Sequence, residues 1–195
     1  MARIGLSQPY AAKYTYDAEA GTVSLTNWKK IGKAVNMTLE AGEAEGDALR
    51  ADNADAETVS AFVSGSGTIT LDDLRQDVAA FIYGIEPRTD GAIVQTAKDR
   101  APHLAFAGVV KHQINNQVKY QAVLLHKIQF GGDGLDVQTE QEPIEFQTPE
   151  LPFTYYRDDT SDEAYRTLRW FDTEADAVAW FTAITAFPET VQAGG

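Results

Sequence analysis

The sequence predicts a mainly β protein, an antiparallel β-sandwich or barrel with a flanking helix and a second helix near the C-terminus. Three observations favour this fold class. Short runs in which apolar and polar residues alternate recur along the chain, as half-buried antiparallel strands require. Two segments instead repeat their apolar residues at helical spacing. The 195 residues are 44% hydrophobic and contain no tandem repeat, so we expect a single domain over residues 1–195.

Ten segments show the alternation expected of strands. They are residues 12–16, 22–25, 33–40, 59–70, 92–96, 103–114, 118–130, 137–147, 151–157 and 167–171. The fourth contains the sequence Gly-Ser-Gly at positions 65–67. Because glycine inside a strand weakens regular pairing, we expect a bulge or a bend at this point.

The clearest pair of strands is 103–114 with 118–130. The sequence Asn-Asn-Gln at 115–117 joins them, and asparagine tolerates the left-handed backbone of a tight hairpin turn. Strict alternation places the even-numbered residues of the second strand on one face. Its other face carries Val123 and Leu125 among polar residues. Both faces therefore need cover, from a second layer or from another subunit.

Two helices are expected, at residues 71–84 and 173–187. Their apolar stripes consist of Leu71, Leu74, Val78, Phe81 and Ile82 in the first, and of Ala177, Trp180, Phe181 and Ile184 in the second. Thr70 and Thr173 are the candidate N-caps, and each precedes by three residues an aspartate that favours the positive end of the helix dipole. Gly84 fits a left-handed C-terminal stop.

Acidic residues are concentrated in two stretches. The chain has 16 Lys and Arg against 29 Asp and Glu, a net charge of −13. Residues 40–57 and 131–150 each carry a net charge of −6, so the remainder is almost neutral. This balance disfavours a basic groove that grips nucleic acid. The absence of cysteine excludes disulfides, thiolate zinc sites and cysteine nucleophiles.

No pattern in the sequence predicts catalysis or a cofactor. His103, His112 and His126 all lie in expected strands and lack the spacing of metal ligands. The acidic segments 133–136 and 157–163 do not match a calcium-binding loop, and solvated turns are the simpler interpretation. No phosphate loop and no nucleophile elbow occurs. We therefore expect a protein that is not an enzyme and that holds no metal.

The N-terminus shows no continuous apolar run, and no segment approaches the roughly 18 apolar residues that span a bilayer. We expect a soluble chain made in the cytosol, without a membrane segment. The last residues, 188–195, are small and polar, so we expect a mobile tail.

Several short sequences occur in an order that resembles one known family. They are RIGLS at 3–7, PYAAKY at 9–14, GKAV at 32–35, ADNA at 51–54, GVVK at 108–111, EFQTPEL at 145–151, RDD at 157–159 and FDTEA at 171–175. In this order and spacing, which extend from the N-terminus to the last helix, the chain resembles the major tail proteins of siphophages and their prophage relatives. These proteins form the tail tube.

The resemblance implies a β-sandwich or barrel of the tail tube type, six subunits per ring, and rings stacked into a hollow tube. It implies no enzymatic activity and no obligatory cofactor. The implied partners are copies of the chain itself and the tape measure, tail-tip and tail terminator proteins. Double-stranded DNA would pass through the tube without being bound specifically, and the location would be the virion tail, assembled in the host cytoplasm.

Stacked rings need protruding arms, and the sequence offers two. A long polar excursion from a β-core is uncommon unless it is functional, so residues 40–57 are expected to dock on a neighbouring subunit. Residues 1–11 are expected to form a second arm that becomes ordered only on assembly. The subunit-interface candidates are Ile4, Leu6, Tyr10, Glu43, Glu45, Asp47, Asp52, Asn53 and Asp55. Because a positive lumen would trap DNA, we expect a lumen lined mainly by negative charge.

Other functions remain open from the sequence. The inner tube of a contractile tail, or of a related secretion tube, would share the architecture. A β-barrel that binds a small ligand is a second alternative, with Trp28, Trp170 and Trp180 around its pocket, although the position of Trp180 on an apolar helix stripe favours core packing. A small hydrolase is disfavoured by the missing motifs.

Overall fold

The computed structural model describes residues 2–45, 49–51, 54–57, 60–86, 88, 89, 92, 94, 96, 99–132, 148–185, 187 and 188. Its elements are β1 (Ala2–Asp17), β2 (Thr22–Lys30), β3 (Ala34–Glu45), β4 (Leu49–Ala51), β5 (Ala54–Glu57), β6 (Ser60–Leu71), α1 (Gln76–Tyr83), β7 (Leu104–Ile114), β8 (Gln117–Phe130), β9 (Glu150–Tyr156), β10 (Arg166–Phe171) and α2 (Glu174–Ile184). The prediction of a mainly β chain with two helices is confirmed.

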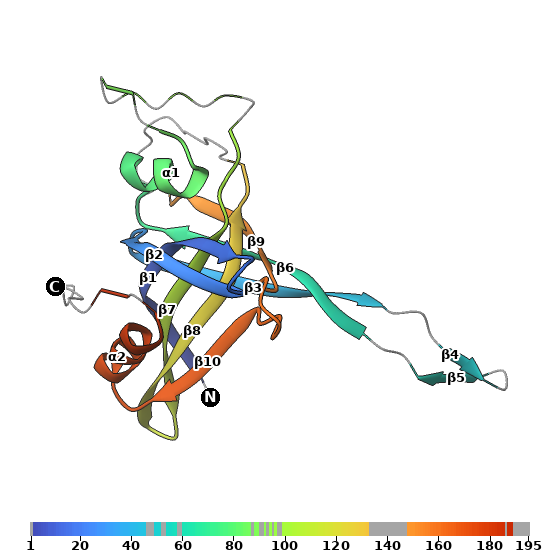
Figure 1. The fold of residues 1–195 in the computed structure, drawn as a ribbon. Coiled ribbons are helices and arrows are strands. Elements are labelled where there is room, and N and C mark those ends of the chain that lie inside the picture. The colour runs from blue at the N-terminus through green and yellow to red at the C-terminus, as the bar shows by residue number, and fades with distance from the viewer. Residues whose placement is uncertain are drawn as a thin grey trace, which may run out of the picture.

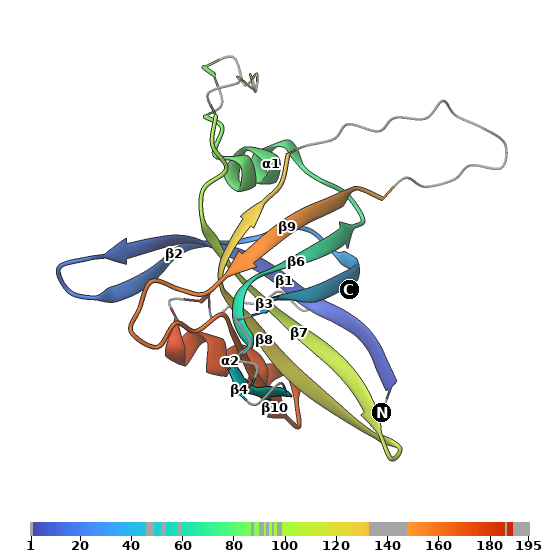
Figure 2. The same cartoon turned by 90° about the vertical axis from the view of Figure 1, so that its right-hand side faces the viewer.

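One antiparallel sheet of eight strands forms the body of the molecule. Seven strands follow the order β2-β1-β7-β8-β9-β6-β3, and β10 joins the sheet through β8. The sheet forks at β8, because the segment from Lys127 to Phe130 pairs with β9 whereas the preceding segment pairs with β10. The sheet also curls until β1 contacts β3, as Figures 1 and 2 show. The result is a partly closed barrel.

Two hydrophobic clusters lie on opposite faces of this sheet. Phe106 and Leu125 belong to an inner cluster, to which α1 contributes Val78 and Ile82 at one end of the curled sheet. Their neighbours Ala107 and Leu124 point the other way, into an outer cluster that α2 covers with Phe181. Both faces of β7 and β8 are thus covered from within the chain. Each large side chain buried in this way stabilises the fold by roughly 1.5–3 kcal/mol.

The central hairpin has the turn that its asparagines predict. Ile114 of β7 pairs directly with Gln117 of β8, which leaves Asn115 and Asn116 as a two-residue turn. Their φ angles of 48° and 63° are the left-handed values of a type I′ turn. The hairpin prediction is therefore confirmed, with Gln117 inside the strand.

The expected face of β8 is correct only for part of the strand. Leu104 pairs with Ile128 but Phe106 pairs with Leu125, so β8 takes three steps where β7 takes two. This bulge reverses the alternation, and both Leu125 and Ile128 point into the inner cluster. The prediction that the even-numbered residues share one face as far as Phe130 is wrong. A strict period of two does not account for the extra residue that a bulge adds to the strand.

The first helix begins later than predicted. Thr70 is not its N-cap, because β6 continues to Leu71 and Thr70 pairs with Asn36 of β3. The N-cap is Arg75, which makes no side-chain capping bond. The predicted stop is confirmed, because Gly84 has a φ of 68° and its N–H donates to the Ala80 carbonyl. Pairing within the sheet thus replaced a helical start that the local sequence favoured.

The second helix begins as predicted and ends three residues early. Thr173 is its N-cap, and the Thr173 hydroxyl accepts a hydrogen bond from the Asp176 N–H at 3.1 Å. The last helical residue is Ile184 rather than residue 187. The strand expected at 92–96 is not found, because the described residues Ala92, Val94 and Thr96 lie in no strand. The strand expected at 137–147 lies outside the described residues.

The two glycines of β6 accommodate aromatic rings from the neighbouring strand β9. Gly65 pairs with Tyr155 and Gly67 with Phe153, without a register shift between them. Of the expected bulge or bend, a bulge is therefore excluded at this point. A Cβ at Gly65 would lie 2.2 Å from the Tyr155 ring, and one at Gly67 would lie 2.5 Å from the Phe153 ring. The glycines leave the space in which these rings lie flat against the strand.

We expect Gly65→Ala to lower the free energy of unfolding by about 1–3 kcal/mol, because the methyl group would push the Tyr155 ring out of the inner cluster. Urea unfolding monitored by circular dichroism measures the change. Gly5→Ala is the matched control within a strand, since a Cβ there meets no atom within 4 Å. Equal stability of the two variants would contradict this account of the glycines.

Candidate functional site

An acidic hairpin projects from the sheet. β3 and β6 stay paired from Ala34 and Leu71 out to Glu45 and Ser60, and β4 pairs with β5 beyond them. Figure 1 shows the two long strands running out past the edge of the barrel, with β4 and β5 at the far end. The segment expected to be an arm, residues 40–57, is therefore the end of a β-hairpin in the described part.

The interface candidates of this hairpin have the following positions. Glu43 and Glu45 lie in β3, where they pair with Phe62 and Ser60 of β6. Asp55 lies in β5. Asp47, Asp52 and Asn53 lie outside the described residues. The structure thus places three of the six candidates on one projecting element.

An aromatic stack holds the base of the hairpin to the body. The ring of Phe62 lies 4.0 Å from that of Tyr165 and 5.4 Å from that of Tyr155, both in stacked geometry. Tyr165 directly precedes β10, and Tyr155 belongs to β9. The hairpin therefore leaves the sheet next to the start of β10, in an orientation that three rings fix.

The N-terminal candidates do not form an arm. They lie in β1, which pairs with β7 from Ala2 onwards and with β2 from Tyr10 onwards. Tyr10 is buried and its ring lies 4.8 Å from that of Phe187. The expectation of an arm over residues 1–11 is corrected for the described residues 2–11. The backbone hydrogen bonds of β7 are satisfied only if this segment enters the sheet.

Ile4 and Leu6 instead border a groove at the open side of the barrel. The groove has a volume of about 590 Å³ and lies between β1, β3 and β10. Ile4, Val35 and Leu168 all line it and are exposed to 52%, 60% and 43%. Three large apolar side chains from different strands thus meet in a surface depression. We therefore treat this depression as a candidate contact surface.

A second hollow, of about 710 Å³, lies on the other side of β10, beside α2. Trp170 and Trp180 line it together with Arg169 and Phe171. Trp28 does not line it, because its ring packs against Phe187 at 5.0 Å. The three tryptophans proposed for a common ligand pocket are therefore not brought together.

The sequence analysis did not single out β10 as functional. Of its six residues, four have exposed side chains, namely Arg166, Leu168, Arg169 and Trp170. The signal that could have pointed to β10 is a short strand that carries two arginines and exposed apolar residues. Arginine and tryptophan are the residue types most enriched at protein interfaces. β10 therefore joins the hairpin as part of the candidate contact surface.

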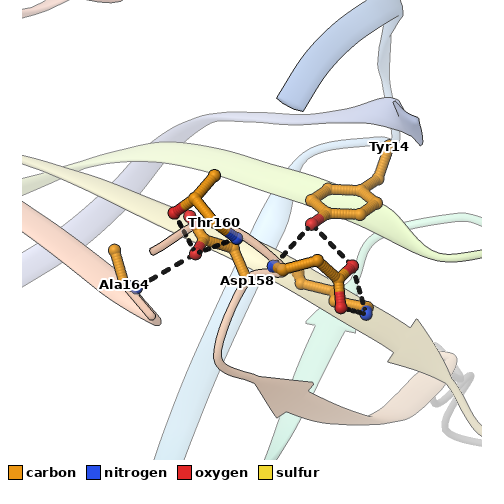
Figure 3. A network of polar contacts seen from close by, with 6 residues as sticks. Tyr14, Asp158, Thr160 and Ala164 are labelled. Atoms are coloured by element: carbon orange, nitrogen blue, oxygen red, sulfur yellow. Dashed lines mark hydrogen bonds and ion pairs between the residues drawn. The ribbon is translucent and has the colours of Figure 1, made fainter. Parts of the chain in front are cut away.

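The acidic loop between β9 and β10 is a structural device, which Figure 3 shows from close by. Asp158 is 7% exposed, and its Oδ1 accepts hydrogen bonds from the N–H of Thr160 and of Ala164 and from the Thr160 hydroxyl. Its Oδ2 lies 3.3 Å from Nδ1 of His126. The expectation of a solvated turn is thus wrong for Asp158, whose carboxylate organises the loop from inside.

Asp159 ties the same loop to β1 and β8. It accepts two hydrogen bonds from Lys127 Nζ, at 2.8 and 2.7 Å, and one from the Tyr14 hydroxyl at 2.9 Å. The bond from Lys127 lowers the pKa of Asp159, and burial raises the pKa of Tyr14. The loop also forms part of a hollow of about 570 Å³, in which Arg157 pairs with Glu163 at 2.8 Å. These charges neutralise one another in pairs.

Each of the three histidines has different neighbours. His126 contacts Asp158, and its Nε2 lies 2.7 Å from the Thr167 hydroxyl. His112 is buried beside Trp170, with 4.7 Å between the rings. His103 packs edge-on against Tyr156. Within the described ranges, no three His, Asp or Glu side chains are grouped so that they could hold a metal ion.

Comparisons with known proteins give no family assignment. The sequence matches no protein-family model, and no curated protein is significantly similar to it. In the part of the chain that the structure describes, no helix is both long enough and apolar enough to cross a membrane.

Stability should depend on pH through His126. Burial lowers its pKa below the ordinary 6.5, although Asp158 opposes the shift. As the pH falls through 6.5, the unfolded chain binds a proton more readily than the folded chain, so the folded state loses stability. We expect the melting temperature to drop between about pH 7.5 and about pH 5.5. We expect a smaller drop in His126→Asn, whose amide nitrogen can still donate to Asp158 but does not titrate.

Thermal melts of both proteins across this range measure the difference. Burial lowers the pKa of His103 as well, so some pH dependence should persist in the variant. An unchanged slope in His126→Asn would show that His126 does not contribute.

Proposed function

We propose that this chain is a tail tube protein of the siphophage type, whose copies form rings that stack into a hollow tube. One observation carries the proposal beyond the sequence resemblance. An acidic β-hairpin leaves a partly closed barrel, and in the described part of the sheet the outer edges of β2, β3 and β10 pair with no other strand. The projecting strand pair of one subunit is complementary to an open sheet edge of another.

Open edges with exposed apolar residues are a liability for a protein that works alone. Monomeric proteins cover such edges or place charges and bulges on them, because they otherwise pair with other chains. Here Leu168 and Trp170 are each 43% exposed on one edge, and Val35 is 60% exposed on another. Contact between two different surfaces of identical subunits is heterologous, and it closes into rings when the rotation permits. Six subunits per ring follow from the resemblance.

The polar groups of the chain support a structural role over catalysis. Asp158, Asp159 and Lys127 bond to their own loop and its supports. They line a hollow of about 570 Å³, but their carboxylates are already hydrogen-bonded within the loop and to its supports, whereas a catalytic acid or base must exchange a proton with a substrate. The strongly acidic composition favours a conduit for DNA, because like charges keep the duplex from adhering to the wall. The tail-tip, tape measure and tail terminator proteins would be the partners in assembly.

The purified protein should form rings or hollow tubes at high concentration or when tail-tip components nucleate assembly. Negative-stain electron microscopy provides the measurement. A reconstruction of the tube should show a lumen with mainly negative side chains. Protein that stays monomeric with a nucleating partner present would contradict the proposed function, and a lumen lined chiefly by Lys and Arg would contradict the proposed role of charge.

Removing the hairpin should abolish assembly and leave the barrel folded. Glu43 and Phe62 are directly paired, so replacement of residues 44–61 by Asn-Gly joins them through a two-residue turn. The variant keeps the Phe62 stack and should melt close to the parent protein. Sedimentation and electron microscopy measure its assembly. Tubes of normal appearance and yield from this variant would show that the hairpin is not an assembly element.

A further inference from the structure

Three polar side chains from separate parts of the chain meet beside the start of β10. Nε2 of His126, in β8, lies 2.7 Å from the hydroxyl oxygen of Thr167 in β10. Nδ1 of the same ring lies 3.3 Å from Oδ2 of Asp158, in the loop between β9 and β10. One imidazole thus connects a carboxylate to a hydroxyl. This arrangement activates alcohols as nucleophiles in proteins, and it is recognised by geometry, not by sequence order.

The carboxylate of Asp158 decides which nitrogen of His126 carries the proton. Oδ1 of Asp158 accepts two hydrogen bonds from Thr160 and one from the Ala164 N–H, as an ionised carboxylate does. Because such a group can only accept, the neutral imidazole places its N–H at Nδ1. Nε2 then keeps its lone pair, and the Thr167 hydroxyl donates to it. The hydroxyl proton therefore already points at a base.

His126 is available as a base near neutral pH. Burial lowers its pKa below the ordinary 6.5, so the ring is mostly neutral at pH 7. Its backbone N–H donates to the Tyr165 carbonyl at 3.2 Å, which holds β8 against the start of β10. The side chain of His126 is 22% exposed and that of Asp158 is 5% exposed, while Thr167 is partly exposed. The base is thus held in place, and the hydroxyl lies at the surface.

Two other threonine hydroxyls have acceptors of a different kind. Thr160 donates to Asp158, and Thr173 donates to Asp176. An aspartate carboxylate has a pKa of about 4, so near neutral pH it does not take up a hydroxyl proton. Thr167 differs from both, because its acceptor is an imidazole that titrates close to neutral pH.

The face of β10 that carries Thr167 leads to the hollow of about 710 Å³ beside α2. Arg169 follows two positions later, and the regular pairing of β10 places both residues on one face. Arg169 lines the hollow with Phe171 and Trp180, and its guanidinium lies 5.3 and 5.9 Å from the centres of these rings. Within the described residues, this guanidinium forms no ion pair with a carboxylate. Aromatic surface and an unpaired positive charge thus adjoin the hydroxyl along the strand.

We propose that Thr167 is a nucleophile for acyl transfer from aryl esters of small carboxylic acids, with His126 as the general base and Asp158 as the group that orients it. The aryl group fits the aromatic side of the hollow, and Arg169 favours the negative charge that develops on the departing aryl oxide. The reaction needs one copy of the chain, so it is independent of the proposed tube.

The reaction balances without a cofactor. Oγ1 of Thr167 attacks the ester carbonyl carbon while Nε2 of His126 takes the hydroxyl proton. The bond between the carbonyl carbon and the aryl oxygen then breaks, and His126 gives its proton to the departing aryl oxide. Water attacks the acylated Thr167 in the same way, which releases the acid and restores the hydroxyl. Asp158 exchanges no proton, in agreement with its position inside the loop.

Hydrolysis of 4-nitrophenyl acetate tests the proposal. We expect the parent protein to release 4-nitrophenol in steady turnover about a hundredfold faster than Thr167→Val, which keeps the shape of the side chain without its hydroxyl. Thr167→Ser should retain the activity, and His126→Asn should lose it. Thr26→Val is the matched control and should react like the parent, since Thr26 is an exposed threonine of another strand. Acetylation of surface lysines does not turn over, so only steady release is counted.

Two further readouts separate catalysis from a structural role. Peptide mapping by mass spectrometry after acid quenching should find an acetyl group on Thr167 of the parent protein. The steady rate should rise with pH and reach half of its maximum below pH 6.5, because the base must be neutral and burial lowers the pKa of His126. Asp158, the charged group in contact with this ring, opposes that shift.

Equal steady rates from the parent protein and a folded Thr167→Val variant would overturn the proposal. Acetyl groups found on lysines alone would overturn it as well, and this result does not depend on whether Thr167→Val folds. Neither outcome affects the tube, because ring and tube formation is measured separately on untreated protein.

Discussion

The fork of the sheet at β8 is the constraint on which the rest of the molecule depends. One strand pairs with β7 along its length on one side and divides its other side between β9 and β10. The bulge at this point lets Leu125 and Ile128 both enter the inner cluster. One branch continues through β9 and β6 to β3 and curls the barrel. The other branch ends after one strand, and it leaves an open edge.

The polar loop between β9 and β10 maintains this fork. Asp158 binds the loop from inside, and Asp159 ties it to Lys127 and Tyr14 on the strands beneath. Partly buried charges are stable only when they are paired and hydrogen-bonded, and each of these carboxylates has such partners. From the sequence, this segment was expected to be a solvated acidic turn. In the structure it holds apart two strands that would otherwise compete for the same side of β8.

The distribution of charge and exposed apolar area gives the proposed assembly its physical basis. Acidic residues are concentrated on the hairpin, while exposed arginines and a tryptophan lie on β10. If charge served only solubility, acidic and basic residues would be mixed over the surface. Here the acidic residues lie on a hairpin that projects from the sheet, and the exposed arginines lie on a strand that borders it. Opposite charge on two different surfaces favours a repeating contact over a symmetric pair.

The sequence by itself determined the local elements, because they depend on neighbouring residues. The paired asparagines specified the turn of the central hairpin, Thr173 and Gly84 specified helix ends, and alternation placed most strands. Tertiary structure alone decided the features that depend on distant partners. Thr70 joined a strand because β3 lies beside it, the N-terminal residues entered the sheet because β7 offers hydrogen bonds, and Gly65 faces a ring from β9. The open edge of β10 belongs to this second group, since an edge exists only once the whole order of strands is fixed.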